Sequence, residues 1–544
     1  MKNYILPVIA LCLFLNKPLT AQNVYHVNIH NGDDTKDGLQ WSSALKNIQP
    51  AIDMAEEGDT LLIAAGIYYP TDKIAEEHKD ETPTSMRHRS FLIKKDIVLY
   101  GGFPADATNE TSMNDRDWQA NLTILSGDFD GNDYNKDGNY PNRQENALHV
   151  IVMLNLTSAM LLDGFHIMSG YAADDYAPVY VGNMLVQHDC GGGIYAISKY
   201  ESSPALANLV IHDNHAGTHG GGFYNYSESG SASPLLTNVT MTGNFADWRG
   251  GGFFNDGMNA NPVLENVNIT GNHVNYDGGG LFCVAQQTTA PKLSNVLISG
   301  NKAKSGSGAY IMAFEDDASP EINNATICGN KSSGNARGSG VIISAQTGIA
   351  SPYIRNSVIW GNRSDRIDNL LIEGSNGVSA EYENNLIEGS STGGTNLSGD
   401  TDPLFVNPID ADLAPTIFDF GDYRLLPESP LINKGQNLFM SLPVDLDGNT
   451  RIVGGIVDIG AYEYQDDTSG NEKITADKII WSHQGNLHVK ITGNSTILRI
   501  FSINGSLFKQ FNNLNEGLIT ISSLPSGYYI VTLSSGETAK IVIR

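Results

Sequence analysis

Three side chains capable of acid–base or charge chemistry stand directly before successive Gly-Gly-Gly triplets. They are His219, Arg249 and Asp277, which follow one another at intervals of 30 and 28 residues. A base, a cation and a carboxylate that meet in one cleft can perform general acid–base catalysis. We therefore predict a candidate catalytic site at these residues, beneath the long segment 171–190. Since turn residues are usually polar in any case, an ordinary surface turn is the alternative.

An acidic segment nearer the N-terminus matches part of a calcium loop. The run 133–138, Asp-Tyr-Asn-Lys-Asp-Gly, fits the first six positions, with oxygen ligands at alternate residues and glycine at the turn. The twelfth position is Gln144, where the pattern has glutamate. We predict a calcium site, with a solvated acidic turn as the alternative. Its candidate ligands are Asp128, Asp130, Asp133, Asn135 and Asp137.

A column of aromatic residues recurs with the triplets. Each triplet is followed by two apolar residues, and neighbouring residues of a strand point to opposite faces. One of the two columns therefore lies outside the core unless a bulge or an overlying loop buries it. We predict a candidate aromatic platform for sugar rings, formed by Tyr195, Tyr224, Phe254, Phe282 and Tyr310.

These residues belong to a repeat that predicts the fold. Triplets begin at Gly191, Gly220, Gly250 and Gly278, and weaker copies begin at 306 and 338. Each copy contains short apolar runs separated by Gly, Pro and Asn, without helical periodicity. A unit this small buries its apolar face only by stacking on its neighbours. The pattern predicts an all-β fold, a right-handed parallel β-helix with coils ~4.8 Å apart.

Two asparagine columns are predicted to be structural. Asparagine tolerates left-handed backbone angles, and its amide can bond the coils above and below. One column is Asn214, Asn244, Asn272, Asn301, Asn330 and Asn362, and the other is Asn208, Asn238, Asn266, Asn295, Asn324 and Asn356.

Composition narrows the classes of partner. The 544 residues include 33 Lys+Arg and 60 Asp+Glu, a net charge of −27. Such a chain repels phosphate, which argues against nucleic acid and anionic membrane surfaces. Beyond the leader no apolar run approaches ~18 residues, so we expect no transmembrane helix. Cys190, Cys283 and Cys328 fall at different repeat positions, and we expect buried free thiols.

The N-terminus predicts export and a capped first coil. Residues 1–21 have the charged start, apolar centre and small-residue end of a signal peptide. Within 41–66, Ile48, Ile52 and Ala55 share one helical face, and Gly58 can end the helix. We expect this helix to cover the apolar end of the solenoid.

Several strings resemble known secreted proteins. Trp41-Ser-Ser-Ala-Leu and Ile48-Gln-Pro-Ala-Ile-Asp53 resemble the N-terminal cap of secreted right-handed β-helix proteins. The coils resemble β-helical polysaccharide lyases and hydrolases, and still more the repeats of polymorphic outer-membrane-type surface proteins. Residues 385–465, with Asp445-Leu-Asp-Gly-Asn449, resemble a choice-of-anchor Q segment and are expected to cap the last coil. These resemblances imply the fold more than the function.

The last residues change period. Residues 466–473 are a predicted linker, and 474–544 have short alternating strands with an Asn504-Gly505 turn, which predicts a small β-sandwich. This block resembles the C-terminal sorting domain of type IX secretion substrates, through Ile500-Phe-Ser-Ile-Asn-Gly505 and Leu524-Pro-Ser-Gly-Tyr-Tyr-Ile-Val531. The resemblance implies a Bacteroidetes source, the type IX secretion machinery as partner, and passage across the outer membrane.

Three functions stay open for the β-helix of residues 22–465. The first is an adhesin-like or glycan-binding surface protein whose partner is a polysaccharide or a cell-surface glycan. The second is a polysaccharide lyase or glycoside hydrolase that works at the corner of His219, Arg249 and Asp277. The third is a passive surface-layer protein. No cofactor is required by any of them, and calcium is the one candidate.

Overall fold

The structure is a computed structural model that divides into two compact units, Met1–Gln465 and Asp466–Arg544. The predicted leader and linker lie outside the residues that it describes. In the first unit these are 22–72, 86–133, 142–173, 178–333, 338–364, 369–390, 393–411, 421–440 and 442–465. In the second they are 480–483, 486–491, 496–502, 507–514, 517–521, 524, 527–533 and 538–543.

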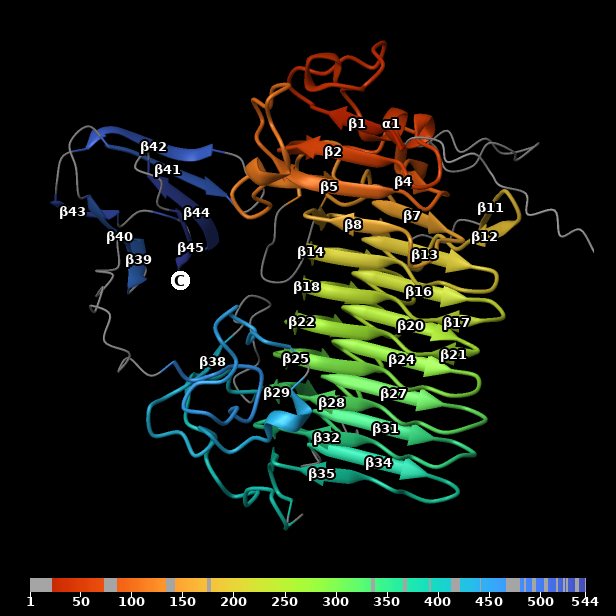
Figure 1. Cartoon of the computed structure of the whole chain (residues 1–544), viewed down its shortest axis with the longest axis vertical. Helices are drawn as coiled ribbons and strands as arrows, with labels where there is room; N and C mark the ends of the chain where they lie inside the picture. The colour runs from red at the N-terminus through yellow and green to blue at the C-terminus, as the bar shows by residue number, and fades with distance from the viewer. Residues whose placement is uncertain are drawn as a thin grey trace, which may run out of the picture. The chain divides into compact units, whose positions relative to one another are not determined.

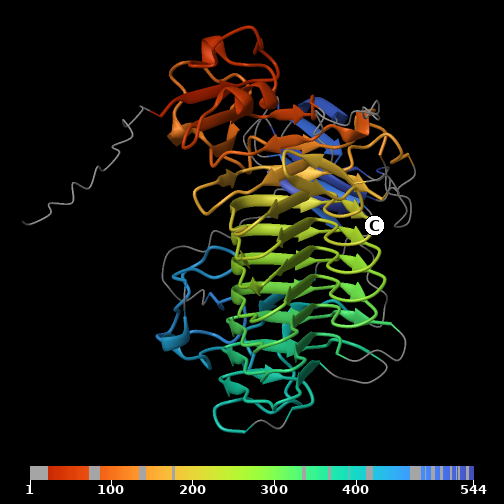
Figure 2. The same ribbon diagram turned by 90° about the vertical axis from the view of Figure 1, so that its right-hand side faces the viewer.

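The first unit is a parallel β-solenoid, as the repeat predicted (Figures 1 and 2). One side of it is a nine-stranded parallel sheet in which successive repeats pair in register, Tyr195 with Tyr224 and Tyr224 with Phe254. Its strands are β4 (Phe91–Ile93), β7 (Ile151–Leu154), β13 (Ile194–Ser198), β16 (Phe223–Ser227), β20 (Phe253–Gly257), β24 (Leu281–Ala285), β27 (Ala309–Ala313), β31 (Val341–Ala345) and β34 (Leu370–Gly374).

A 17-stranded sheet forms the opposite wall, and a six-stranded sheet of two-residue strands forms a short third side. The wide sheet contains β1 (Val24–Val27), β2 (Thr60–Ala64), β3 (Gly66–Tyr68), β5 (Val98–Phe103), β6 (Thr123–Ser126), β8 (Leu161–Asp163), β9 (His166–Met168), β14 (Ala205–His212), β18 (Leu235–Thr242), β22 (Val263–Thr270), β25 (Lys292–Ser299), β28 (Glu321–Asn323), β29 (Thr326–Cys328), β32 (Tyr353–Arg355), β33 (Val358–Trp360), β35 (Glu381–Glu383) and β36 (Leu386–Ile387). The third side contains β10 (Tyr171–Ala172), β15 (His215–Ala216), β19 (Phe245–Ala246), β23 (His273–Val274), β26 (Lys302–Ala303) and β30 (Lys331–Ser332).

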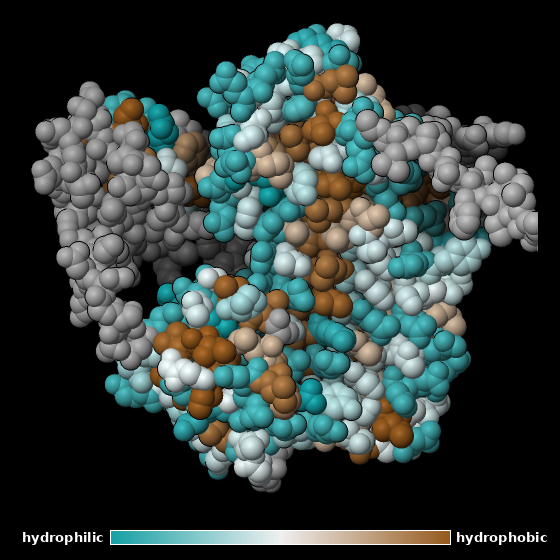
Figure 3. Space-filling model, viewed as in Figure 1, coloured by the Kyte–Doolittle hydropathy of each residue, from teal (hydrophilic) through white to brown (hydrophobic). Residues whose placement is uncertain are grey.

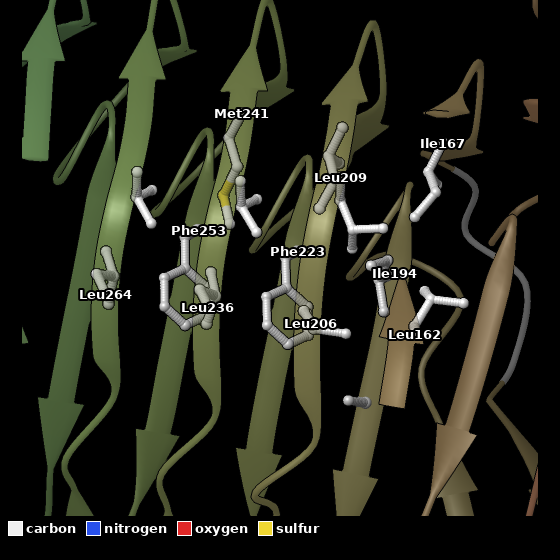
Figure 4. Close-up of a cluster of buried hydrophobic side chains, with 14 of the residues drawn as sticks. Leu162, Ile167, Ile194, Leu206, Leu209, Phe223, Leu236, Met241, Phe253 and Leu264 are labelled. Carbon is white, nitrogen blue, oxygen red and sulfur yellow. The ribbon is translucent and has the colours of Figure 1, made fainter. Parts of the chain in front are cut away.

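The core fills the space between these walls. Inward residues of the two sheets meet, and Figure 4 shows Phe223 and Phe253 side by side among leucine, isoleucine and methionine. Their ring centroids are 4.9 Å apart and the planes differ by 3°. Each coil adds one layer to the same continuous core, which is how a small repeat becomes stable. On the face drawn in Figure 3, hydrophobic residues gather in patches among hydrophilic ones.

Both asparagine columns are structural, as predicted. In the buried column each side-chain oxygen accepts from the amide of the preceding coil, as in Asn244 Nδ2 to Asn272 Oδ1 at 3.0 Å. The other column has positive φ, 52° at Asn208 and 55° at Asn238, and bends the wide sheet at that corner. Left-handed geometry is cheaper for asparagine than for most other residues.

A helix is present where the N-terminal pattern predicted one. Helix α1 (Ile48–Met54) lies near β1, and its apolar face joins the core, with Ile48 and Ile52 buried. Short 3-10 turns are η1 (Trp41–Ser43), η2 (Met86–His88), η3 (Met113–Asp115) and η4 (Asn437–Phe439). No helix among the described residues is long and apolar enough to cross a membrane.

Of the segment 385–465, which was expected to close the last coil, the described residues from 397 onward pack along the flank of the solenoid instead. Three residues of the left-handed asparagine column, and Asn384, which continues it with a φ of 55°, donate to the segment's carbonyls across successive coils: Asn295 to Val444 O, Asn324 to Asp458 O, Asn356 to Gln436 O and Asn384 to Lys434 O. Its strands β37 (Phe405–Asn407) and β38 (Asp422–Leu425) contribute Phe405 and Tyr423 to an apolar cluster on the outer face of the wide sheet. The left-handed asparagine column therefore both bends the wide sheet and binds the flanking segment.

The second unit is antiparallel. A three-stranded sheet holds β39 (Ile480–His483), β40 (Asn486–Ile491) and β43 (Gly517–Ile521), and a four-stranded sheet holds β41 (Thr496–Ser502), β42 (Leu507–Leu514), β44 (Gly527–Leu533) and β45 (Thr538–Ile543). Both sheets contribute to one apolar cluster that includes Val489, Ile500 and Val531. The predicted Asn504-Gly505 turn lies outside the described residues.

Candidate functional site

The three predicted catalytic residues occupy one corner of consecutive coils. His219 pairs with Arg249, and Arg249 with Asp277, through isolated parallel bridges that lead into the nine-stranded sheet. The following glycines have φ values of 66°, 64° and 69° at Gly220, Gly250 and Gly278. A side chain is strained in this conformation, so glycine permits the chain to turn just after each functional residue.

Arg249 and Asp277 are brought together. Arg249 Nε lies 3.5 Å from Asp277 Oδ2, and both side chains are partly exposed. The guanidinium carbon also sits 5.0 Å from the ring centre of Phe282, a cation–π contact. Burial raises the pKa of Asp277, and the nearby Arg249 charge partly offsets this. The pair presents one fixed cation and one fixed carboxylate at the surface.

His219 does not join this pair. Its ring stacks on Phe254 with centroids 4.5 Å apart and planes 11° apart. Its Nδ1 is buried without a hydrogen-bond partner, and among the described residues no hydrogen bond links it to Arg249 or Asp277. Burial and the Arg249 charge lower its pKa to about 4, so the imidazole is neutral at pH 7. The structure therefore does not assemble the predicted catalytic trio.

The exposed aromatic residues of this corner are Trp248 and Tyr276. They stand next to Arg249 and Asp277, are 54% and 50% exposed, and their rings lie 5.9 Å apart. Asn275 Nδ2 donates to Asp247 Oδ1 at 3.1 Å beside them. We call Trp248, Arg249, Tyr276 and Asp277 the corner ridge. In the sequence, Trp248 and Tyr276 directly precede Arg249 and Asp277. Only their exposure in the structure distinguishes these two rings from the buried aromatic residues.

The predicted platform is wrong as an exposed surface. Its rings lie outside the main core, as expected, but Tyr195, Tyr224, Phe254 and Phe282 are at most 8% exposed, and Tyr310 is partly buried. Neighbouring centroids lie 5.1 to 5.6 Å apart, the first four rings are stacked and Tyr310 is tilted by 54° against Phe282, and together they form a second apolar cluster. Sugar cannot reach rings that are already packed.

A hairpin covers the start of this column. Strands β11 (Val179–Val181) and β12 (Met184–Val186) pair antiparallel and pack their apolar side chains into the same cluster. Gln187 N donates to the Tyr195 hydroxyl at 3.2 Å, and that hydroxyl donates to Leu185 O at 3.3 Å. The long segment before the first triplet therefore covers Tyr195.

Asp256 is a further acid on the same outer face. It follows Phe254 by two residues on β20 and so points outward with it. Burial raises its pKa to about 6, with a smaller opposing effect of Arg249. Sequence analysis missed it because the neighbouring coils have Tyr226 and Val284 at this position, so no repeat drew attention to it.

The predicted calcium segment is only partly described. Asp128 is buried, Asp130 is exposed and Asp133 is mostly buried, while Asn135 and Asp137 lie outside the described residues. Oxygen atoms of Asp128, Asp133 and Glu145 lie within 4.8 Å of one another. Burial raises the pKa of Asp133 to about 6. Glu145 was not predicted, because the loop pattern ends one residue earlier.

A pocket of about 310 Å³ lies elsewhere, between the wide sheet and the flanking segment. Cys328, Trp360 and Arg363 line it from the coils, and Phe405 and Ile409 line it from the segment. Cys190, Cys283 and Cys328 are free and buried, as predicted. Burial raises the pKa of each thiol, so none of the three is an activated nucleophile.

Comparison with known proteins identifies the C-terminal unit. Residues 483–544 match the family described as secretion system C-terminal sorting domain. This domain indicates secretion across the outer membrane to the cell surface or the extracellular space. No curated protein matches the chain. The choice-of-anchor Q resemblance and the Bacteroidetes source stay predictions.

Two solved structures show distant similarity. Pectate lyase Pel9A is 14% identical over 82% of this chain and 97% of that one, with a TM-score of 0.37. The GH136 lacto-N-biosidase from Eubacterium ramulus is 11% identical over 66% of this chain and 67% of that one, with a TM-score of 0.25. Similarity at this level says nothing about whether this chain is a catalyst.

Proposed function

Starting from a solenoid that is exported across the outer membrane, we propose that it binds glycans at the corner ridge and acts as an adhesin-like surface protein. The observation that carries the proposal is the pair of exposed rings, Trp248 and Tyr276, on consecutive coils. Exposed aromatic faces beside fixed polar groups suit sugars, which offer an apolar face and a rim of hydroxyls.

The ridge supplies both kinds of contact. The rings provide apolar area, and they lose little freedom on binding because each is held by its neighbours: Trp248 contacts His219, and Tyr276 lies under Lys304. Arg249 and Asp277 provide donors and acceptors at a fixed 3.5 Å separation. An arginine at this position favours glycans that carry carboxylate groups, because the guanidinium pairs with carboxylate in a fixed geometry.

The test is affinity electrophoresis of the full exported chain through gels that contain neutral or acidic polysaccharides. We expect retention by at least one acidic polysaccharide and a loss of about tenfold in affinity for Trp248→Ala and for Tyr276→Ala. Tyr200→Ala is the matched control, since Tyr200 is 68% exposed but lies beyond the other end of β13. Equal retention of Trp248→Ala and the wild type would reject the ridge as the binding site.

A polysaccharide lyase or hydrolase is the second candidate, and Asp256 favours it. A partly buried acid with a pKa of about 6 near Arg249 is suited to proton transfer. New reducing ends that disappear in Asp256→Asn, while gel retention persists, would make this an enzyme. Retention without cleavage supports the binding function. If no polysaccharide is either retained or cleaved, a passive surface-layer protein is the function that stays open.

A further inference from the structure

Three carboxylates gather in the stretch of chain between β6 and β7. Asp128, Asp133 and Glu145 each place one oxygen within 4.8 Å of the others. Asp128 is 8% exposed, and the Asp133 side chain is also 8% exposed. Like charges this close repel strongly where little water screens them. Positive charge at this point therefore stabilises the folded chain.

The neighbouring residues satisfy only part of the cluster. Backbone amides of Asn132 and Asp133 donate to the two oxygens of Asp128, at 3.1 and 3.0 Å. Asn146 Nδ2 donates to Asp133 Oδ2 at 2.8 Å. Arg143 Nε stands 3.8 Å from the same oxygen, but its Nη2 donates to the carbonyl of Asp213 at 2.8 Å.

Three oxygens in this group are buried and accept no hydrogen bond. They are Asp133 Oδ1, Glu145 Oε1 and Asn146 Oδ1. Asn146 is 0% exposed, and its side-chain nitrogen, not its oxygen, faces Asp133. Buried acceptors are rarely left unpaired. Asp133 Oδ1 and Glu145 Oε1 belong to carboxylates of the cluster, and a cation satisfies such acceptors.

We propose that Asp128, Asp133 and Glu145 bind one calcium ion, with Asn146 holding Asp133 in position. All available ligands are oxygens, which hard divalent cations prefer. Carboxylates bind calcium through one or both oxygens, so three of them supply up to six ligands. Calcium fits better than magnesium, because calcium accepts irregular geometry whereas magnesium requires near-ideal octahedral geometry.

The position assigns the ion a structural role. Asp128 follows β6, while Glu145 leads toward β7, and Asn146 Nδ2 also donates to Ser169 O at 2.8 Å, just beyond β9. The ion therefore ties together early coils before the regular repeats begin. Because it binds the folded chain and not the unfolded one, it raises the unfolding temperature.

The full exported chain, stripped with a chelator, is titrated with terbium and then with calcium. Tyr69 is the sensitiser, since its ring lies 6.5 Å from that of Phe129, the residue that follows Asp128. We expect terbium emission that calcium displaces, and an unfolding temperature that rises with calcium and rises less with magnesium at the same concentration. This titration needs no variant.

Asp133→Asn and Glu145→Gln keep the shape of each side chain and should abolish both the emission and the calcium-dependent rise. Asp130→Asn is the control, because Asp130 belongs to the same turn but is exposed and outside the cluster. Absence of emission from the wild-type chain overturns the proposal, as does an unchanged response in Glu145→Gln. Equal stabilisation by magnesium would overturn the choice of calcium.

Discussion

Two sets of aromatic rings follow the same repeat on one flank of the solenoid and have opposite environments. Tyr224, Phe254 and Phe282 are buried in a stack, whereas Trp248 and Tyr276, a few residues before them in the chain, are half exposed. The first set lies on the sheet, where the next coil, His219 and Arg249 cover the rings. The second lies on the corner, where Trp248 and Tyr276 stay 54% and 50% exposed despite their contacts with His219 and Lys304. Periodicity alone therefore does not reveal which ring a ligand can reach.

The largest expected effect comes from Phe254→Ala in the buried stack. Removing a ring that contacts Tyr224, Phe282 and His219 should reduce the free energy of unfolding by about 3 to 5 kcal/mol. Denaturant unfolding of the full chain measures this loss, with Trp248→Ala as the matched control at about 0.5 kcal/mol or less. Equal losses in the two variants would erase the distinction between buried and exposed rings.

Uncovering the stack should have the next largest effect. Met184→Ala removes a side chain that is 1% exposed and packs in the hairpin over the column, and should cost about 2 kcal/mol. Amide hydrogen exchange should then accelerate in β13, beneath the hairpin, while β31 stays protected. Unchanged exchange in β13 would mean that the hairpin does not stabilise the column.

A pH dependence should follow from His219. Its folded pKa of about 4 lies below the ordinary 6.5, so the unfolded chain binds more protons between these values. The contribution of His219 is therefore complete above pH 6.5 and is lost as the pH falls toward 4, by about 1 to 2 kcal/mol at pH 5. Asp256, with its raised pKa of about 6, acts in the opposite direction between pH 4 and 6.

Comparing the unfolding free energy of the wild type and His219→Gln at pH 7 and pH 5 isolates the histidine, because Asp256 is common to both. We expect the wild type to lose more stability than the variant between these values. The reverse order would show that His219 is protonated in the folded chain and therefore is not buried on Phe254.

The smallest stability change is expected at the ridge itself. Arg249→Gln removes a partly exposed ion pair, worth less than about 1 kcal/mol, but also removes the cation offered to the glycan. Gel retention on acidic polysaccharide should fall while retention on a neutral one is kept, and added salt should reduce the difference. Equal loss on both polysaccharides would mean that the arginine supports the ridge and does not recognise charge.

The repeat made most of the solenoid predictable. Glycine triplets at intervals of 28 to 30 residues and two asparagine columns indicated parallel coils, structural amide ladders and the aligned corner of His219, Arg249 and Asp277, all of which the structure confirms. These features are predictable because each coil contacts mainly its neighbours, so sequence spacing translates directly into spatial alignment.

The candidate site was less predictable. Whether His219 faced the ion pair or the ring of Phe254 depends on packing between coils, and so does the burial of Tyr195 under the β11–β12 hairpin. Asp256 and Glu145 belong to no column, so neither repeat nor motif pointed to them. The docking of 397–465 along the flank also depends on contacts between residues far apart in the chain, such as Asn295 with Val444.

The sequence by itself determined the all-β repeat, the alignment of its corners and the terminal sorting domain, because these follow from local spacing and turn chemistry. Only the tertiary structure decided which aromatic residues are exposed, which charged residues meet, and where buried oxygens lack partners. Exposure and pairing are properties of surfaces in contact, and a hairpin or segment brought from elsewhere in the chain can change them without altering the repeat.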